Sequence, residues 1–333
     1  MNVCPGCLKE NHTTYCTSCK KSLFDGKTVN HILPFTKPEY QEIHFEQVKQ
    51  LSISGVQTKH SLKLNNKTLE LTNTSGEYIL KPVTTNEFNN PDEVPLNEHL
   101  TMQIASQIFK IKTAVNGLVF FPDGEPAYIT RRFDRDTDGN KILQEDFAQI
   151  SGKTEENSGE NYKYSSSYED IGKLIDTYVA AKIVEKEKLF NLVLFAYLTS
   201  NCDAHLKNFS LYRENNFGDY LLTPAYDLIN TGLHIPNEEN LALDLFADDF
   251  MTNGFEYSSK YGKDDFIEFG NRLGLISSRI ERILSLYSSK TSEIKDLINK
   301  SFLSDELKEK YIKSVEMRTG RISYSYDNDK GQE

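Results

Sequence analysis

Two acidic residues and one amide in the second half of the chain are of the types that bind a metal ion and move a proton. Asp203 and Asn208 are five positions apart in S-N-C-D-A-H-L-K-N-F, directly after a strongly apolar run. Asp227 follows in T-P-A-Y-D-L, after a short predicted pair of strands. An isolated Asp in a loop most often caps a turn or a helix. Carboxylate and amide oxygens that converge from the two ends of a hairpin instead suit a hard, hydrated cation such as Mg²⁺.

The spacing of these residues is typical of a phosphoryl-transfer site. In protein kinases, D-x-x-x-x-N supplies an Asp that accepts or orients the proton of the attacking hydroxyl and an Asn that holds Mg²⁺ on the ATP phosphates, and a second metal-binding Asp follows. Upstream, Lys81 ends the predicted strand Y-I-L-K-P and Glu98 lies near the start of the next predicted helix, as the kinase lysine and its acidic partner do. Each charge alone would be interpreted as a solvated surface residue, but the ordered set favours a nucleotide site.

The surrounding pattern predicts strands first and helices later. Alternating residues predict a hairpin over 62–71 around Asn65-Asn66, a strand over 78–81, an amphipathic helix over 97–109 and a hairpin around Pro122-Asp123-Gly124. The Ser-, Gly- and Glu-rich segment 151–167 predicts a mobile, irregular loop. Beyond it we expect helices over 168–184 and over the apolar residues 189–198, a strand pair over 209–212 and 220–222, and further helices over 264–317.

Four of the five cysteines lie at the amino terminus, and they predict a structural zinc site. Cys4, Cys7, Cys16 and Cys19 form C-P-G-C and C-T-S-C, two knuckles whose thiolates can surround one zinc ion tetrahedrally. A pair of disulfides is the alternative, but disulfides are rare in cytosolic proteins. A site closed by four thiolates has no open coordination position, so we interpret the ion as structural.

Composition excludes several classes of protein. The chain of 333 residues has 38 basic and 49 acidic side chains, a formal net charge of −11, and 38% hydrophobic residues. This length and composition exclude disorder of the whole chain. The acidic balance argues against a broad nucleic-acid-binding face, and no apolar stretch reaches the roughly 18 residues of a membrane helix. The amino terminus lacks the pattern of a secretory leader, so we expect a soluble, cytoplasmic protein.

Seven short motifs, taken in order, resemble the HipA family of bacterial serine/threonine kinase toxins. They are S-I-S-G-V-Q-T-K, Y-I-L-K-P, N-E-H, R-R-F-D-R, Q-E-D-F, N-C-D-A-H-L-K-N-F and P-A-Y-D-L. The resemblance implies an α+β, two-lobed, protein-kinase-like fold that uses ATP and Mg²⁺, with a small β-rich N-lobe and a mostly helical C-lobe. The chain has no G-x-G-x-x-G and no Walker A motif. The resemblance implies that the segment 52–59 covers the nucleotide instead.

The resemblance also implies roles for individual residues. Asp203 would be the catalytic base, Asn208 and Asp227 the Mg²⁺ ligands, and Lys81, with Glu98, the phosphate-binding group. Lys207 would neutralise the transferring phosphoryl group, and His205 would brace the catalytic loop. The nucleotide would also contact Ser54, Gly55, Val56, Gln57, Arg132 and Phe133. Ser52 and Ser54 would be sites of autophosphorylation.

The chain departs from the family in two places. Long members carry a β-rich amino-terminal subdomain of domain-like size, whereas here the preceding segment is short and contains the cysteines. The chain therefore resembles the short HipT type, in which that subdomain is a separate small protein. Ser200 stands where the family usually has Gly. We expect a zinc-knuckle segment, a small zinc ribbon, over 1–35, an N-lobe over 36–133, a C-lobe over 134–320 and a flexible tail over 321–333.

The leading hypothesis is an ATP- and Mg²⁺-dependent serine/threonine protein kinase that acts as the toxin of a toxin–antitoxin system. The resemblance implies a HipB-like DNA-binding antitoxin and a separate HipS-like protein as partners, and an aminoacyl-tRNA synthetase as substrate. DNA would be reached only through the antitoxin, and no membrane partner is expected. Two alternatives stay open: a small-molecule kinase, and a zinc-dependent binding module with an inert kinase-like body.

Overall fold

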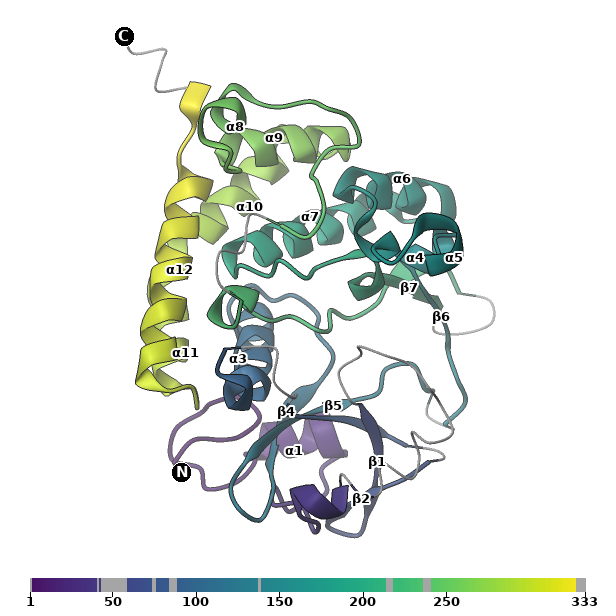
Figure 1. Cartoon of the computed structure of the whole chain (residues 1–333), viewed down its shortest axis with the longest axis vertical. Coiled ribbons are helices and arrows are strands. Elements are labelled where there is room, and N and C mark those ends of the chain that lie inside the picture. The colour runs from purple at the N-terminus through teal and green to yellow at the C-terminus, as the bar shows by residue number, and fades with distance from the viewer. Residues whose placement is uncertain are drawn as a thin grey trace.

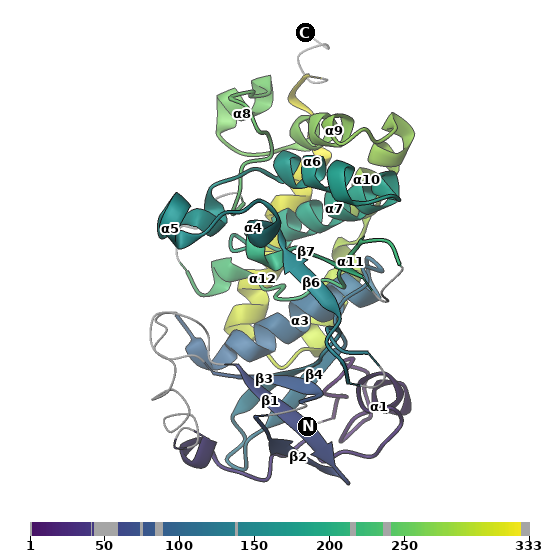
Figure 2. The same ribbon diagram turned by 90° about the vertical axis from the view of Figure 1, so that its right-hand side faces the viewer.

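The computed structural model describes residues 2–40, 42, 59–73, 76–83, 89–136, 139–213, 218–235 and 241–327. Figure 1 shows a sheet-rich part at one end of the molecule and a larger helical part at the other. Helix α3 (Val94–Gln107) lies between these two lobes, and the view in Figure 2 shows the same order. No helix in the described part of the chain is long and apolar enough to cross a membrane.

An antiparallel sheet forms the smaller lobe. Within the described residues the strand order is β2 (Thr68–Leu71), β1 (His60–Asn65), β3 (Tyr78–Pro82), β5 (Pro126–Arg131) and β4 (Asn116–Phe120). Both predicted hairpins are confirmed, because β1 pairs with β2 and β4 pairs with β5. The first turn lies one residue later than predicted, at Asn66-Lys67, since Asn65 pairs with Thr68 and Asn66 takes a left-handed φ of 55°.

Helix α3 connects the two lobes. It begins three residues earlier than predicted, with Pro95 in its first turn, where a missing backbone N–H costs little. Every residue from Val94 to Ala105 is buried, because α3 contacts β4 and β5 on one side and α11 (Thr291–Lys300) on another. Burial on all sides fixes the direction in which Glu98 points.

Helix α7 (Lys182–Leu198) is the central element of the larger lobe. Its residues from Leu192 to Leu198 are all buried, as predicted for this apolar run. Around it pack α6 (Tyr168–Tyr178), α9 (Lys263–Arg272), α10 (Ser277–Ser289) and α12 (Asp305–Ser323), with the short α8 (Asn253–Ser258) beside α9 and α11 against α12. The helices predicted over 264–317 are thus confirmed.

The prediction of a single helix over 168–184 was wrong, because the chain forms two helices there. Helix α6 ends at Tyr178, and Val179 takes an extended conformation before α7 begins at Lys182. Val179 is buried, whereas Ile183, four residues later, is half exposed. One continuous helix would have placed both on the same face.

A small sheet carries the loop that contains Asp203. Its strands are β6 (Leu143–Asp146), β7 (Ser210–Arg213) and β8 (Leu221–Leu222), in that order within the described residues. The predicted strand pair is therefore confirmed as β7 and β8. A single 3₁₀ turn, Leu206–Asn208, leads from the loop into β7. Asp203 thus lies between α7 and β7, and Asp227 follows β8.

The segment 151–167, predicted to be irregular, contains local structure. After the short helix α4 (Phe147–Ile150) come helix α5 (Glu155–Ser158) and a 3₁₀ turn over Tyr162–Tyr164. Thr154 and Asn157 form a capping box at the start of α5. A helix of one turn has too few residues to show a hydrophobic period, so the sequence pattern did not reveal it.

The cysteine-containing segment packs on the sheet of the smaller lobe. Helix α1 (Thr17–Phe24) brings Leu23 and Phe24 into the same hydrophobic cluster as Leu80 and Val119 of the sheet. The Tyr15 hydroxyl donates a hydrogen bond to the Leu118 carbonyl at 2.6 Å. The two units predicted over 1–35 and 36–133 therefore share one core.

At the other end of the chain, α12 continues to Ser323, beyond the boundary predicted at residue 320. The backbone N–H of Tyr326 donates to Asp264 of α9 at 2.7 Å. Residues 328–333 lie outside the described residues.

Candidate active site

Three charged side chains from separate elements meet at the boundary between the lobes. Lys81 of β3 donates to Glu98 Oε1 of α3 at 2.5 Å and also contacts Asp227 Oδ1. The Lys81 and Glu98 side chains are only 5% and 4% exposed. Lys59 Nζ lies 3.3 Å from the other oxygen of Asp227. Buried charges require partners, so these groups hold one another in position.

The electrostatics of this cluster keep Asp227 ionised. Burial by itself would raise the pKa of Asp227, but Lys81 and Lys59 outweigh burial and hold that pKa well below its usual range. Burial opposes the charge of Lys81 too, yet Asp227 and Glu98 raise the Lys81 pKa above its ordinary value. For Glu98, burial dominates and raises the pKa despite the attraction of Lys81. The site therefore presents a carboxylate and an ammonium group at neutral pH.

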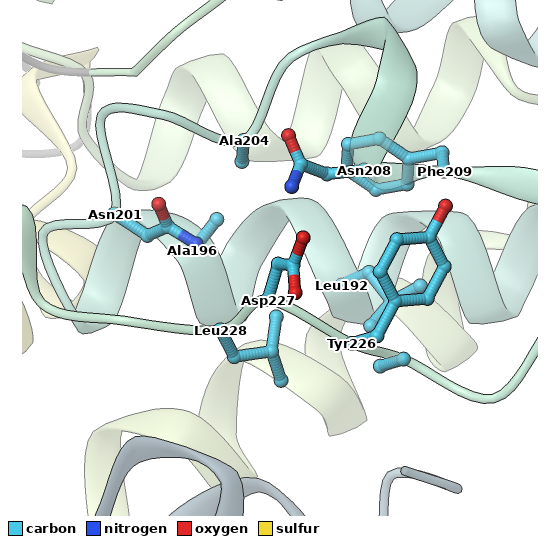
Figure 3. A pocket seen from close by; sticks show the side chains of 10 residues that line it. Leu192, Ala196, Asn201, Ala204, Asn208, Phe209, Tyr226, Asp227 and Leu228 are labelled. Carbon is cyan, nitrogen blue, oxygen red and sulfur yellow. The ribbon is translucent and has the colours of Figure 1, made fainter. Parts of the chain in front are cut away.

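Asn208 and Asp227 line one small pocket, together with Asn201, Ala204 and Leu192 among others. Figure 3 shows the side chains of Asn208 and Asp227 on opposite sides of it. Among the residues that the structure describes, the buried Asn208 Oδ1 has no hydrogen-bond partner. A buried amide oxygen without a partner is costly unless water or a cation binds it. This pair of oxygen ligands therefore suits a hard cation such as Mg²⁺.

Asp203 lies beside the pocket, and its carboxylate is close to polar atoms of Tyr164 and His205. The Tyr164 hydroxyl donates to Asp203 Oδ1 at 2.5 Å, and His205 Nε2 lies 3.7 Å from the same oxygen. Burial lowers the pKa of His205, so its ring is neutral at physiological pH. The backbone N–H of His205 also donates to the Asp203 carbonyl at 2.8 Å. This geometry is consistent with a bracing role for His205.

Lys207 points away from the Lys81 cluster in this structure. Its Nζ donates to Asp146 Oδ2 at 2.9 Å. Asp146 ends β6 and accepts a hydrogen bond from Gln149 N as the cap of α4. Asp146 belongs to the motif Q-E-D-F, but its pairing with Lys207 is not evident from the sequence.

Two further site residues, Lys59 and Tyr164, were also not predicted from the sequence. Lys59 ends the motif S-I-S-G-V-Q-T-K, whereas no sequence signal identifies Tyr164.

Arg132 and Phe133 lie at the junction of the lobes rather than on the Lys81 cluster. Arg132 forms a two-pronged ion pair with Asp134, with distances of 2.9 and 2.5 Å. The ring of Phe133 lies 5.7 Å from the ring of Tyr226, the residue before Asp227. The five candidate loop residues, Ser52, Ser54, Gly55, Val56 and Gln57, lie outside the described residues.

The backbone conformation at Ser200 explains why a glycine suits this position. Its φ is 49°, in the left-handed region that glycine adopts without strain. Hydrogen bonds offset the strain, because Ser200 Oγ contacts Ser314 Oγ at 2.8 Å and accepts from Arg318 Nε at 3.3 Å. Both partners belong to α12, so this long helix positions the loop that carries Asp203.

The four amino-terminal cysteines form a compact cluster of free thiols. Their sulfur atoms all lie within 4.8 Å of one another, and Cys7 Sγ is 3.7 Å from Cys16 Sγ. Tetrahedral zinc with Zn–S bonds of about 2.3 Å requires sulfur atoms about 3.8 Å apart. Gly6 is required here, because a Cβ atom would lie 2.6 Å from Cys19 Sγ. The geometry suits one zinc ion.

The cysteine cluster also contacts helix α3. His99 Nε2 lies 3.1 Å from the Gly6 carbonyl, and Gln107 donates to the Cys7 carbonyl at 3.0 Å. His99 is the neighbour of Glu98 in the sequence. The segment therefore supports the helix that carries the partner of Lys81.

These features define the fold class used by protein kinases: two lobes, a buried Lys–Glu pair between them, and a loop with Asp and Asn before a second Asp. Two solved structures share this fold. One is Shewanella oneidensis HipA in complex with HipB and operator DNA, with a TM-score of 0.61 and 21% identity over 84% of this chain and 70% of that one. The other is the Helicobacter pylori proinflammatory kinase CtkA, with a TM-score of 0.52 and 17% identity over 78% of this chain and 92% of that one.

Residues 51–294 match the family described as the HipA-like C-terminal domain, and the chain belongs to that family. A Haemophilus influenzae protein named provisionally as a kinase is 31% identical over 91% of this chain and 92% of its own length. The Shewanella oneidensis serine/threonine-protein kinase toxin HipA is 27% identical over 61% of this chain, and the match spans 48% of that protein. The family predicted from the seven motifs is thus confirmed.

Proposed function

We propose that this chain is a Mg²⁺- and ATP-dependent serine/threonine protein kinase and the toxin of a toxin–antitoxin system. The observation that carries the proposal is the meeting of Lys81, Glu98 and Asp227 beside Asn208, whose buried amide oxygen has no described hydrogen-bond partner. An inert binding module would have no need to bury Lys81 and Glu98 beside Asp227, since buried charges are costly to retain.

Each residue of the site would have a separate task in phosphoryl transfer. Lys81, held by Glu98, would bind the α- and β-phosphates of ATP, and Lys59 is close enough to share in phosphate binding. Asp227 and Asn208 would hold Mg²⁺, which neutralises charge on the β- and γ-phosphates when bound. Because Lys81 now contacts Asp227 directly, we expect these two side chains to separate slightly when a nucleotide binds.

Asp203 would act on the acceptor. The acceptor hydroxyl oxygen attacks the γ-phosphorus, the bond from that phosphorus to the β–γ bridging oxygen breaks, and ADP leaves with the electron pair. Asp203 orients the hydroxyl and takes up its proton. The exposed fraction of the Asp203 side chain is 49%, so this carboxylate lies at the protein surface, although the Tyr164 hydroxyl covers its Oδ1.

The proposal can be tested with labelled ATP and a cell lysate. The purified wild-type chain should transfer label from the γ-phosphate to a discrete lysate protein in the presence of Mg²⁺. Asp203→Asn should not do so, whereas Asp305→Asn, which changes a fully exposed carboxylate at the start of α12, should behave as wild type. Label that appears only on small molecules would indicate a small-molecule kinase instead.

For the acceptor we propose an aminoacyl-tRNA synthetase, as the family resemblance implies. Identification of the labelled lysate protein by mass spectrometry tests this part separately. A labelled protein of another kind would leave the kinase activity standing and contradict the substrate.

Autophosphorylation on Ser52 or Ser54 is part of the proposal. A phosphoserine adds close to two negative charges at neutral pH. In a segment that ends at Lys59, beside Asp227, these charges would repel the phosphates of ATP and inactivate the enzyme. Mass spectrometry of protein expressed in cells should find phosphate on one of these serines in the wild type and none in Asp203→Asn. Phosphate on either serine in Asp203→Asn would mean that another kinase had added it.

The partners would be a HipB-like DNA-binding antitoxin and a separate HipS-like protein. The solved Shewanella HipA structure contains HipB and operator DNA, which supports the first of these by analogy. The net charge of −11 supports contact with DNA only through the antitoxin. Expression of the wild type alone should arrest growth, and co-expression with the antitoxin from the same operon should restore it.

For the cysteine cluster we propose one structural zinc ion. The donor set, the 3.7 Å sulfur separation and the backbone N–H groups of Gly6 and Cys16 that point at Cys4 Sγ support it. Elemental analysis of the purified chain should find about one zinc per chain.

A further inference from the structure

Tyr164 makes a direct contact with the proposed catalytic base. Its hydroxyl donates to Asp203 Oδ1 at 2.5 Å, a short hydrogen bond to a charged acceptor. Its ring packs edge-on against His205, with a centroid separation of 5.1 Å. The Lys163 ammonium lies 5.0 Å from the Tyr164 ring centroid. Tyr164 therefore lies over the loop that contains Asp203 and His205.

The group that Tyr164 presents to Asp203 is the same kind of group that an acceptor must present. A Ser or Thr hydroxyl has to donate its proton to this carboxylate from within about 3 Å before it can attack phosphorus. A phenol that already lies at 2.5 Å from Oδ1 occupies that position. An acceptor and Tyr164 cannot both approach the same oxygen from the solvent side.

The segment that carries Tyr164 is exposed over most of its length and attached at its end. Residues 154–161 are exposed, Lys153 contacts the Ser165 backbone across the base of the segment, and the partly buried Tyr162 and Tyr164 pack against the main hydrophobic core. By contrast, the nearby Tyr168 is fully buried and donates to the Ala204 carbonyl at 2.9 Å, which fixes the catalytic loop itself. A segment held through two partly buried tyrosines opens at lower cost than the loop beneath it, which the fully buried Tyr168 holds in place.

We propose that Tyr164 occupies the acceptor-hydroxyl subsite of Asp203, so that segment 154–165 must move aside before a protein acceptor is phosphorylated. This inference rests on the proposed function, because it assigns Asp203 as the base. It identifies the surface around Tyr164 as the place where the acceptor's Ser or Thr enters. The acceptor must therefore offer an exposed hydroxyl-bearing segment that can replace the 3₁₀ turn Tyr162–Tyr164.

The first test measures phosphate release from Mg²⁺-ATP with water as the acceptor, which requires no identified substrate. Tyr164→Phe keeps the ring and removes the hydroxyl. It should raise the hydrolysis rate by about tenfold, the shift expected when one charge-assisted hydrogen bond no longer favours the closed form. The dissociation constant for Mg²⁺-ATP should change less than about twofold, because Tyr164 does not contact the Lys81 cluster. Tyr178→Phe, a half-exposed tyrosine at the end of α6, is the matched control and should equal wild type.

A fall in hydrolysis for Tyr164→Phe would show that Tyr164 positions Asp203 for catalysis, and an unchanged rate would show that its hydroxyl does not compete. Either result overturns the inference. If wild type and Tyr164→Phe are both inactive, the proposed function fails instead, and a second measurement decides the inference.

That second measurement is limited trypsin digestion, which does not depend on activity. Lys163 lies directly before Tyr164, and cleavage after it requires the segment to open. Tyr164→Phe and Asp203→Ala should both speed this cleavage by about tenfold relative to wild type and Tyr178→Phe. Equal cleavage rates in all four proteins would mean that the Tyr164–Asp203 contact does not hold the segment, and the inference would be wrong.

Discussion

At the scale of single residues, Asp227 is the carboxylate on which the other charges converge. It contacts Lys81 and Lys59, and it shares a pocket with Asn208. Its φ of 55° places it in the left-handed region that Asp tolerates better than most residues. A strained backbone at the centre of a charged cluster is typical of a functional site.

Asp227→Asn should therefore weaken the binding of ATP itself. The amide keeps the shape of the side chain but removes the charge that attracts Mg²⁺. We expect a loss of at least about tenfold in affinity for ATP with Mg²⁺ and a much smaller change without the metal. Calorimetric titration of both forms checks this, and equal affinities with Mg²⁺ would exclude Asp227 as a metal ligand.

Asp227 should also make the fold sensitive to acid. Lys81 and Lys59 hold its pKa below the ordinary value, so an unfolded chain binds a proton to this carboxyl at a pH where the folded chain does not. The stabilisation is complete above about pH 5 and is lost as the pH falls below about 4. Between pH 7 and pH 3, urea unfolding should show a larger loss of stability for wild type than for Asp227→Asn. An equal loss in both would contradict the pKa assignment.

Ser200 offers a test of backbone strain beside the catalytic loop. Ser200→Gly relieves the positive φ but loses the contacts to Ser314 and Arg318, whereas Ser200→Ala loses the contacts and keeps the strain. The glycine variant should be more stable than the alanine variant by about 1 kcal/mol. Chemical unfolding of the pair measures this difference, and an alanine variant as stable as the glycine variant would show that the position is unstrained.

At the scale of elements, α3 joins the catalytic cluster to the cysteine segment. Glu98 reaches Lys81, and the next residue, His99, contacts the Gly6 carbonyl between Cys4 and Cys7. The proposed zinc site and the proposed nucleotide site are thus connected by one helix.

Loss of the metal should therefore affect both stability and nucleotide binding. We expect Cys4→Ser to abolish zinc binding, to lower the melting temperature by about 4 °C or more, and to weaken ATP binding through the displacement of α3. Cys202→Ser, which changes the cysteine outside the cluster, should keep its zinc and its melting temperature. Full zinc content in Cys4→Ser would exclude this cysteine as a ligand.

The sequence was informative where function depends on spacing along the chain. The order of Lys81, Glu98, Asp203, Asn208 and Asp227 predicted the cluster, and residue alternation predicted the hairpins that position it. The break between α6 and α7 could not be predicted, because Val179 fits a helical pattern and only tertiary packing makes it extended. Contacts between distant segments, such as Tyr164 with Asp203 and Lys207 with Asp146, likewise leave no local pattern.

At the scale of the whole molecule, the lobes are joined through the segments that carry the site. Ala225, two residues before Asp227, donates to the Lys112 carbonyl and accepts from Ala114, both at 2.8 Å. Lys112 and Ala114 lie between α3 and β4, so the smaller lobe is hydrogen-bonded to the Asp227 segment of the larger lobe. Movement of one lobe relative to the other would change the distance between Lys81 and Asp227, so we expect the proposed nucleotide to alter how the two lobes meet.

We infer that this site transfers the γ-phosphate of ATP through Asp203. The most direct measurement is a single-turnover assay of the purified chain with labelled ATP, in which label transferred to protein or released as phosphate is followed with and without Mg²⁺. The wild type should transfer label only with Mg²⁺. Asp203→Asn should bind ATP with nearly unchanged affinity and react more slowly by a factor on the order of 10² or more. Equal rates in the two proteins, or transfer by the wild type without any divalent metal, would contradict the account.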